Sequence, residues 1–376
     1  MSRLNELIAE LCPDGVKFVK LNEMIDYEQP TKYIVKSTNY DDSYKIPVLT
    51  AGQSFILGYT NEHFGIYQAT SENPVIIFDD FTTSFHWIDF SFKVKSSAIK
   101  ILKQKNTRIV NFKFIYYSMK NINYIPVNHA RQWIEKYSNF KIPLPPLPVQ
   151  EEIVRILDNF TELTEKLTAE LTARKKQYEY YRDKLLTFGD EVPKVRLKTV
   201  SKLTRGVRVV KSQLSKSGTY PVFQNSMTPL GYFEKSNFPK NTVFVISAGA
   251  AGEIGYSKVD FWAADDCYCL TCSDCLNSRF LYYAMLCQKK YICSRVRKAS
   301  VPRLARSVIE ELQIPLPSLS EQERIVSILD RFDALCNDLT SGLPAEIEAR
   351  QKQYEYYRDK LLSFPELKEN KEESLT

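Results

Sequence analysis

The chain repeats one module, and this repeat constrains its fold more than any other feature. Residues 173–188 (ARKKQYEYYRDKLLTF) match residues 349–364 (ARQKQYEYYRDKLLSF) with two substitutions. Residues 142–160 (IPLPPLPVQEEIVRILDNF) match residues 314–332 (IPLPSLSEQERIVSILDRF). The start of the chain joins the pattern, because Asp14, Val16, Val19 and Leu21 recur 176 residues later. The beginning of the chain thus matches the segment that follows the first QYEYYRDKLL. This pattern predicts two similar units in a cyclic arrangement.

Two long inserts, 15–142 and 191–314, separate the matching blocks and resemble each other only faintly. Fragments such as IPVLTAGQSFILGYTNEHF and YPVFQNSMTPLGYFEKSNF predict one shared fold with different side chains. We expect an α+β protein with two mixed α/β domains, separated by two long antiparallel coiled-coil helices in a pseudo-twofold cyclic repeat. The predicted parts are an N-terminal helix (1–14), the first insert (15–142), a central helical spacer (143–190), the second insert (191–314), a distal helical spacer (315–364) and a disordered tail (365–376).

The spacers are predicted to be helices because their apolar residues recur every three or four positions after each IPLPxL motif. A helix over residues 149–188 would be roughly 60 Å long at about 1.5 Å per residue. In the second copy, Gly342 and Pro344 should break or kink the helix, with Pro344 at the first position of a restarted turn.

Charge separates the inserts from the spacers. The first insert has 16 Lys and Arg against 11 Asp and Glu, for a net charge of +5, and the second has 19 against 9, for +10. The rest of the chain carries −9, which gives the overall +6. Because Lys and Arg supply most non-specific affinity for nucleic acid, the inserts are where a polyanion would bind. The acidic helices are instead predicted to contact protein.

Composition excludes several classes of protein. No stretch approaches the roughly 18 apolar residues of a membrane span, and the N-terminal segment lacks the pattern of a secretory signal, so we expect a cytoplasmic protein. Five of the eight cysteines lie between Cys267 and Cys287, but a strand there would place Cys267 and Cys269 on one face and Cys272 on the other. That spacing favours ordinary buried thiols over a zinc site, and no metal site is predicted.

No catalytic residues are predicted. The glycine-rich segment 249–255 lacks the lysine of a nucleotide-binding loop, and the three histidines are widely separated in the sequence. The acid pairs Asp79–Asp80 and Asp265–Asp266 could in principle hold Mg²⁺, but they are interpreted as solvated acids in loops or at strand ends.

The whole chain resembles the specificity subunit of type I restriction-modification enzymes. The resemblance rests on IPLPPLPVQEEIVRILD and IPLPSLSEQERIVSILD, each followed by KQYEYYRDKLL, and on insert phrases such as DDFTTSFHWIDFSFKVKSSAIKIL. It implies that each insert is a target recognition domain reading one half of a bipartite site in double-stranded DNA. It also implies that the helices set the gap and bind two methyltransferase subunits, and that motor-nuclease subunits join them. S-adenosylmethionine, ATP and Mg²⁺ would belong to those partners, with no cofactor in this chain.

Polar and basic residues of the inserts are the candidates for DNA contacts, because Arg or Lys suits guanine and Asn or Gln suits adenine. In the first insert they are Lys36, Ser37, Asn39, Gln53, Thr82, Thr83, His86, Arg131 and Gln132. In the second they are Arg205, Arg208, Lys211, Gln224, Asn225, Ser226, Arg297, Lys298 and Arg303. Arg131 and Arg303 correspond at the 172-residue offset, which predicts phosphate contacts common to both halves. An ordinary surface role remains the alternative for each residue.

Identical residues of the repeated QYEYYRDKLL are the candidates for partner binding. Tyr178 and Tyr181 fit the helical seam and need only packing, whereas the other positions should face outward. These candidates are Glu179, Tyr180, Arg182 and Asp183, with Glu355, Tyr356, Arg358 and Asp359 in the second copy. Two other functions stay open: a coiled-coil scaffold that binds only protein, and the specificity part of a fused restriction enzyme.

Overall fold

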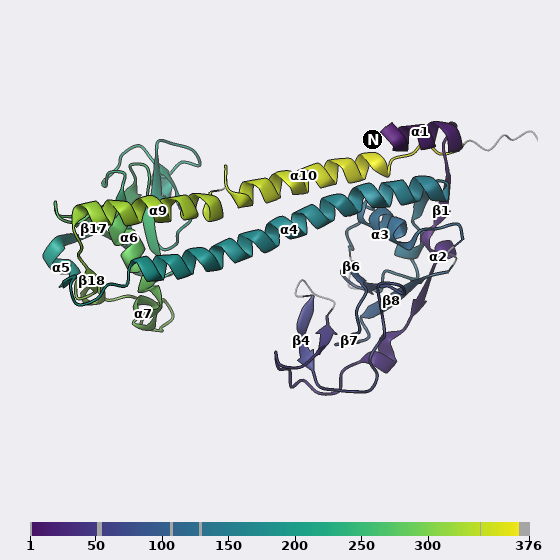
Figure 1. Cartoon of the computed structure of the whole chain (residues 1–376), viewed down its shortest axis with the longest axis horizontal. Helices are drawn as coiled ribbons and strands as arrows, with labels where there is room; N and C mark the ends of the chain where they lie inside the picture. Colours follow the sequence, from purple (N-terminus) through teal and green to yellow (C-terminus); the bar gives the residue numbers. More distant parts are fainter. Residues whose placement is uncertain (1, 51–54, 106–107, 128–129, 339, 368–376) are drawn as a thin grey trace, which may run out of the picture. The chain divides into compact units, whose positions relative to one another are not determined.

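The computed structural model describes residues 2–50, 55–105, 108–127, 130–338 and 340–367. It divides into two compact units. Unit 1 comprises residues up to 165 together with those from 348 onward, and unit 2 comprises residues 166–347. Neither unit is one sequence repeat, because each combines one insert with helical segments from both copies (Figure 1).

In unit 1 the insert forms three small sheets. Their strand orders are β2-β8-β5-β6, β4-β3-β7 and β1-β9. All neighbouring strands are antiparallel except β3 and β7. The strands are β1 (Lys17–Lys20), β2 (Ile25–Glu28), β3 (Ile46–Leu49), β4 (Ile56–Thr60), β5 (Val75–Asp79), β6 (Phe85–Ile88), β7 (Lys93–Val94), β8 (Ile99–Gln104) and β9 (Lys141–Leu144).

Unit 2 repeats this topology strand for strand. Its sheets have the orders β11-β17-β14-β15, β13-β12-β16 and β10-β18, again with one parallel pair, β12 and β16. The shared fold expected for the two inserts is therefore confirmed. The strands are β10 (Lys194–Arg196), β11 (Ser201–Arg205), β12 (Tyr220–Phe223), β13 (Gly231–Phe233), β14 (Thr242–Ile246), β15 (Ile254–Ser257), β16 (Trp262–Ala263), β17 (Cys267–Cys272) and β18 (Gln313–Pro315).

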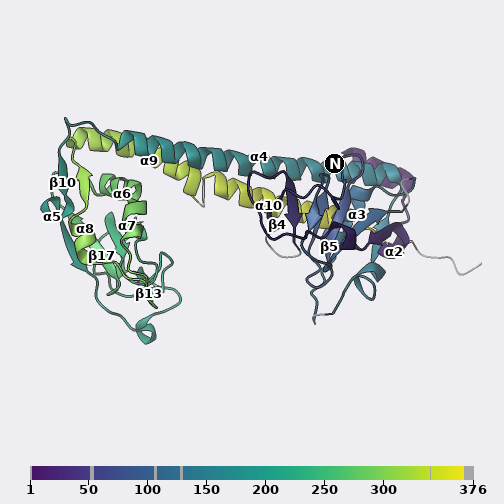
Figure 2. The ribbon, with the colours of Figure 1, turned by 90° about the horizontal axis from the view of Figure 1, so that it is seen from below.

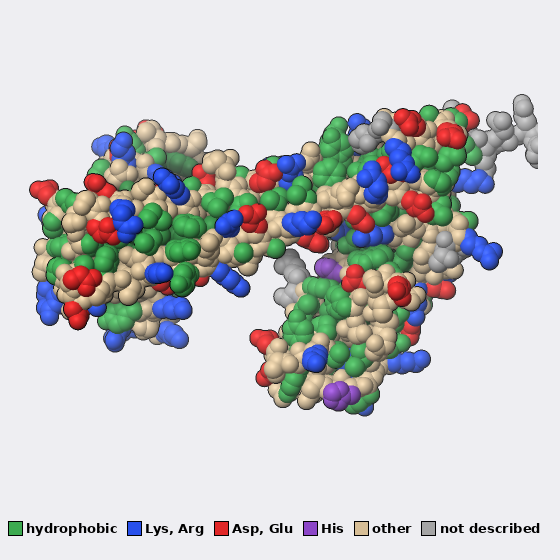
Figure 3. Space-filling view, viewed as in Figure 1, with side chains coloured by type: hydrophobic (Ala, Val, Ile, Leu, Met, Phe, Trp, Pro, Cys, Tyr) green, Lys and Arg blue, Asp and Glu red, His purple; other side chains and the backbone are tan. Residues whose placement is uncertain are grey.

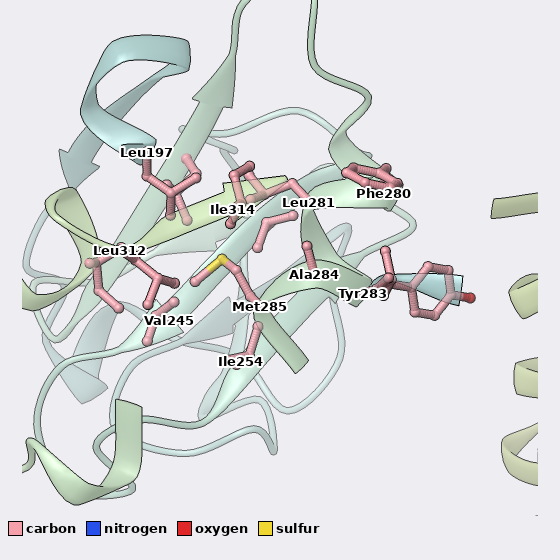
Figure 4. Close-up of a cluster of buried hydrophobic side chains, with 14 of the residues drawn as sticks. Leu197, Val245, Ile254, Phe280, Leu281, Tyr283, Ala284, Met285, Leu312 and Ile314 are labelled. Carbon is pink, nitrogen blue, oxygen red and sulfur yellow. The ribbon is translucent and has the colours of Figure 1, made fainter. Parts of the chain in front are cut away.

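The central strands β5 and β14 are buried along their whole length because both faces of each four-stranded sheet are covered. Side chains alternate between two cores, as the pleat of a strand requires. In unit 1, Ile76 and Phe78 pack with α3, and Val75 and Ile77 pack toward β3 and β7. Figure 4 shows the corresponding core of unit 2, where Val245 of β14 lies among side chains of α6.

One helix of each insert covers its four-stranded sheet. These helices are α3 (Phe112–Lys120) and α6 (Ser278–Cys287), and each begins at an asparagine whose side chain accepts two backbone N–H groups. Asn111 and Asn277 thus occupy the same place in the two units. The shorter helices are α2 (Leu21–Met24), α5 (Leu197–Val200), α7 (Lys289–Ser294), α8 (Arg306–Glu310), η1 (Pro30–Tyr33), η2 (Tyr137–Asn139) and η3 (Lys211–Gln213).

The central spacer is one helix, α4 (Leu147–Leu185), of 39 residues. It begins two residues before the predicted range 149–188 and ends three residues earlier. The distal spacer is split into α9 (Leu319–Asn337) and α10 (Leu343–Leu361), which confirms the predicted break near Gly342. Pro344 is the second residue of α10 rather than the first. Asp338 ends α9 by accepting hydrogen bonds from the backbone and hydroxyl of Thr340 and from Ser341.

Each unit pairs the start of one copy's helix with the end of the other copy's helix. In unit 1 the first part of α4 runs antiparallel beside α10 (Figures 1 and 2), and the rings of Phe160 and Tyr357 stack at 5.4 Å. In unit 2 the equivalent rings, Phe332 and Tyr181, stack at 5.8 Å. This exchange is the cyclic closure that the repeat predicts, while the pseudo-twofold axis stays a prediction.

Segments from the beginning and the end of the described chain pair in unit 1, near α1 (Ser2–Leu11). Val16 pairs with Glu366 in a parallel bridge, and the Leu367 N–H donates to the Val16 carbonyl at 2.9 Å. The predicted disorder of the tail is therefore wrong for residues 365–367, because backbone pairing holds them in place. Residues 368–376 lie outside the described part of the chain.

The cysteine-rich segment forms β17, with Cys267 and Cys269 buried on one face and Cys272 less covered, as predicted. Burial raises the pKa of the Cys267 thiol to about 12, so it is protonated at neutral pH. Among the described residues, no three His, Cys, Asp or Glu side chains lie close enough to hold a metal ion. None of the described helices has the length and hydrophobicity that crossing a membrane requires.

Candidate nucleic-acid and partner interfaces

The turn after the central strand is the point at which many of the predicted DNA contacts meet. We call residues 80–84 of unit 1 and residues 247–253 of unit 2 the recognition turns. In unit 1 the Gln132 N–H donates to the Asp80 carbonyl at 2.8 Å, and in unit 2 the Leu304 N–H donates to the Ser247 carbonyl at 2.8 Å. Arg131 and Arg303 therefore reach the same point of the two folds, which confirms their predicted correspondence.

Unit 1 builds its recognition turn around two buried acids. Asp79 accepts the N–H groups of Phe81 and Thr82, and Thr83 adopts a left-handed conformation with φ of 60°. The acid pair Asp79–Asp80 is buried, so its interpretation as solvated is wrong. Thr82 is exposed at the turn, whereas Thr83 is buried and its hydroxyl donates to the Thr82 carbonyl.

Gln132 does not face solvent, and its selection as a DNA contact is wrong. Its side chain is 0% exposed. The Tyr124 hydroxyl donates to Gln132 Oε1 at 2.7 Å, and Gln132 Nε2 donates to the Ala130 carbonyl at 2.6 Å. These bonds satisfy a buried amide and give Gln132 a structural role.

His86 is half-buried on β6, with its ring 4.4 Å from that of Phe55. Burial, helped by the nearby Lys120 charge, lowers the pKa of His86 below its usual value of 6.5. The imidazole is therefore neutral at pH 7 and would meet DNA as a hydrogen-bonding group rather than as a cation.

The remaining candidates of unit 1 lie in the segment after η1. Lys36, Ser37 and Asn39 are exposed, and the backbone N–H groups of Lys36 and Ser37 both donate to Glu62 Oε1. Glu62 is itself paired with the buried Lys93 at 3.0 Å, so a buried ion pair holds the backbone of this segment. Gln53 lies outside the described residues.

In unit 2 the recognition turn gathers candidates from four segments. The Asn225 carbonyl accepts from Ala250 N–H, and Ala248 of the turn bridges to Arg303, which in turn bridges to Arg297. Arg205 Nε donates to the Asp265 carbonyl at 2.6 Å, and the neighbouring Asp266 carbonyl binds the turn at Ser247. The candidates that the structure brings together here are Arg205, Gln224, Asn225, Ser226, Arg297 and Arg303. Arg208 and Lys298 are exposed on the adjoining loops, and Lys211 is exposed at the start of η3.

The candidate partner surface consists of the outward residues of the repeated QYEYYRDKLL. Tyr180 is 61% exposed and Tyr356 is 62% exposed. Glu179, Asp183, Glu355 and Asp359 are also exposed, and acidic and basic side chains alternate along the helices on the face in Figure 3. Two lysines that the sequence reasoning missed, Lys184 and Lys360, extend over the two exposed tyrosine rings.

Arg182 and Arg358 were expected to face outward, and this is wrong. Their side chains are only 16% and 20% exposed. Each guanidinium lies over the ring of the tyrosine four residues earlier and pairs with the next aspartate in the chain. An arginine four residues after a tyrosine lies on the same helix face, which is why these two side chains turn inward.

Two equivalent clusters, one in each unit, attach the insert to its helix, and sequence reasoning did not select them. Gln150 and Gln322 are 0% exposed, and each binds three backbone groups of the insert and the IPLPxL turn. Asp158 accepts the Tyr117 hydroxyl and pairs with Lys113, while Asp330 accepts the Tyr283 hydroxyl and pairs with Arg279. The repeat could have indicated these residues, because Gln150 and Asp158 recur unchanged 172 residues later as Gln322 and Asp330.

A family model described as "Type I restriction modification DNA specificity domain" matches residues 13–173 and again residues 189–349. The chain belongs to this family. It is 41% identical over 400 residues to the Escherichia coli type I restriction enzyme EcoR124I/EcoR124II specificity subunit, covering 97% of this chain and 98% of that one. It is 31% identical to a putative type I specificity subunit of Haemophilus influenzae, covering 83% and 86% of the two chains.

Solved structures support the fold of this specificity subunit. A crystal structure of a type I restriction-modification S subunit from M. genitalium matches with a TM-score of 0.66 and 16% identity, covering 93% of this chain and 96% of that one. A structure from a study of type I restriction-modification complex assembly matches with a TM-score of 0.53 and 17% identity, covering 94% and 98%. The predicted fold class, two α/β domains with long helices, is confirmed.

Proposed function

We propose that this specificity subunit reads a bipartite, asymmetric DNA site, with each unit contacting one half. The observation that carries the proposal is that the two recognition turns occupy the same place, between matching strands of the four-stranded sheets, but differ in length and in side chains. Unit 1 offers Asp-Phe-Thr-Thr-Ser at residues 80–84, and unit 2 offers Ser-Ala-Gly-Ala-Ala-Gly-Glu at residues 247–253. The same fold with different groups at one place suits the reading of two different sequences.

The helices and their identical outer residues support a second part of the proposal. They would set the gap between the half-sites and bind two methyltransferase subunits, with motor-nuclease subunits joining the assembly in the cytoplasm. S-adenosylmethionine, ATP and Mg²⁺ would be bound by those partners, and this chain would be non-catalytic. No step of the chemistry is assigned to a residue of this chain.

The test is co-expression of the full chain with an adenine methyltransferase subunit of the same system, followed by sizing and DNA binding. We expect two methyltransferase subunits per chain and specific binding to a split, asymmetric sequence. A protein-only scaffold would form complexes that bind no DNA. A fused restriction enzyme would modify or cut DNA with the chain alone.

Insertion of four residues into α4 gives a separate prediction. Residues 163–174 are three consecutive tetrads that each begin with leucine, so an added Leu-Thr-Ala-Glu continues the pattern. One added tetrad lengthens a helix by roughly 6 Å and rotates its end by about 40°. That length is close to two base-pair rises of about 3.4 Å. We expect the gap between half-sites to change while the bases of each half-site, which serve as the internal control, stay the same. Mapping of methylated sites measures this, and an unchanged gap would contradict it.

A further inference from the structure

Asp80 lies at the base of the recognition turn of unit 1 and is completely buried, at 0% exposed. Its Oδ1 accepts the N–H groups of Gln132 and Trp133 at 3.1 and 2.9 Å. Its Oδ2 lies 3.5 Å from Lys100 Nζ and 3.4 Å from Arg131 Nη1. A buried carboxylate costs much free energy unless it is paired and hydrogen-bonded, and here both oxygens are satisfied.

The two cations around Asp80 differ in their access to solvent. Lys100 is 1% exposed and serves to neutralise Asp80 inside the fold. Arg131 is 48% exposed, and Asp80 holds one end of its guanidinium. The Arg131 Cζ atom lies 5.9 Å from the centre of the Phe81 ring. Because the lysine compensates the carboxylate, Arg131 keeps its full positive charge while its orientation is fixed.

A fixed orientation serves base reading more than phosphate binding. Discrimination of guanine requires two parallel hydrogen bonds to O6 and N7, which a rigid guanidinium edge supplies. A phosphate contact carries no sequence information and tolerates a mobile side chain, so it does not need a guanidinium held by a buried carboxylate.

Unit 2 provides a natural comparison. Ser247 stands where Asp80 stands in unit 1, and Tyr268 stands in place of Lys100, judged by the matching strand pairs. Arg303 bridges to the turn through its backbone. Across the described segments of the chain, its side chain has no hydrogen-bond or ion-pair partner. The two arginines occupy equivalent positions in the fold, but only Arg131 has a buried carboxylate that holds its side chain.

We propose that Asp80 is a positioning residue that holds Arg131 for reading a guanine in the half-site of unit 1, whereas Arg303 contacts phosphate in the other half. This inference rests on the proposed function. It assigns different roles to Arg131 and Arg303, whereas their correspondence in the sequence predicts that both contact phosphate.

The experiment uses the full chain in complex with methyltransferase subunits and a set of duplexes with every base pair of each half-site replaced singly. Arg131→Ala should reduce discrimination at one G·C pair of the first half-site by about 5- to 150-fold and leave the other positions unchanged. Arg131→Lys should not restore it, because an ammonium lacks the planar fork. Asp80→Asn should reduce discrimination at the same base pair, and Asp80→Asn with Arg131→Ala should behave as Arg131→Ala alone.

Arg303 is the matched control. Arg303→Ala should weaken binding to all duplexes by a similar factor and make it less sensitive to salt, and Arg303→Lys should restore most of the affinity. The inference is overturned if Arg131→Ala weakens all duplexes alike and Arg131→Lys restores binding. If Asp80→Asn does not fold, the Arg131 variants still decide whether Arg131 reads a base or contacts phosphate, and a phosphate contact overturns the inference. Failure of the proposed function would be seen separately, as a wild-type complex that does not distinguish duplex sequences.

Discussion

Replacing Tyr180 by glutamate should leave a complex with one methyltransferase subunit, and replacing both Tyr180 and Tyr356 should leave none. Tyrosine is enriched among the few residues that carry most of the energy of a protein interface, and truncation of such a residue costs about 2 kcal/mol or more, roughly a 30-fold loss of affinity. The two residues are equally exposed and have the same neighbours, so each should govern one binding event.

Tyr180→Phe and Tyr356→Phe are the matched controls, because they keep the ring on which the lysine of the next turn lies. Native mass spectrometry of co-expressed complexes measures the stoichiometry. If both glutamate variants retain two partner subunits per chain, the repeated QYEYYRDKLL is not the docking surface.

Gln150→Ala should lower the free energy of unfolding of unit 1 by about 3 kcal/mol, because three buried backbone groups would each lose a partner at roughly 1 kcal/mol or more. Those groups are the N–H of Asn111 and the carbonyls of Ile109 and Pro145. Gln322→Ala should destabilise unit 2 by a similar amount, because its three bonds are the same.

The controls are Glu151→Ala and Glu323→Ala, which change exposed residues next to each glutamine. Unfolding of the full chain in urea, followed by hydrogen exchange in each unit, measures the effect. We expect protection to fall in the unit that carries the substitution. Equal loss in both units, or no loss in either, would show that these glutamines do not fasten insert to helix.

The sequence predicted what depends on periodicity and repetition. The spacing of apolar residues was enough to predict α4, because a helical pattern repeats over many turns. Gly342 and Pro344 predicted the break before α10. The repeat itself predicted the cyclic closure, which the stacked pairs Phe160–Tyr357 and Phe332–Tyr181 show in each unit. It also contained the junction residues Gln150 and Gln322, although their role was not recognised.

Only the tertiary structure decided which polar residues face solvent. The sequence predicted Gln132 and Arg182 to be surface residues. In the structure Gln132 is buried and bonded to Tyr124, and Arg182 lies against the ring of Tyr178. Asp80 read as a solvated acid, but its partners Lys100 and Arg131 come from other segments of the insert. A buried charge is stable only where the fold supplies partners, and those partners are set by the packing of strands distant in sequence rather than by any local pattern. The sequence by itself thus determined the repeated architecture, and the tertiary structure determined which polar side chains that architecture buries and which it leaves exposed.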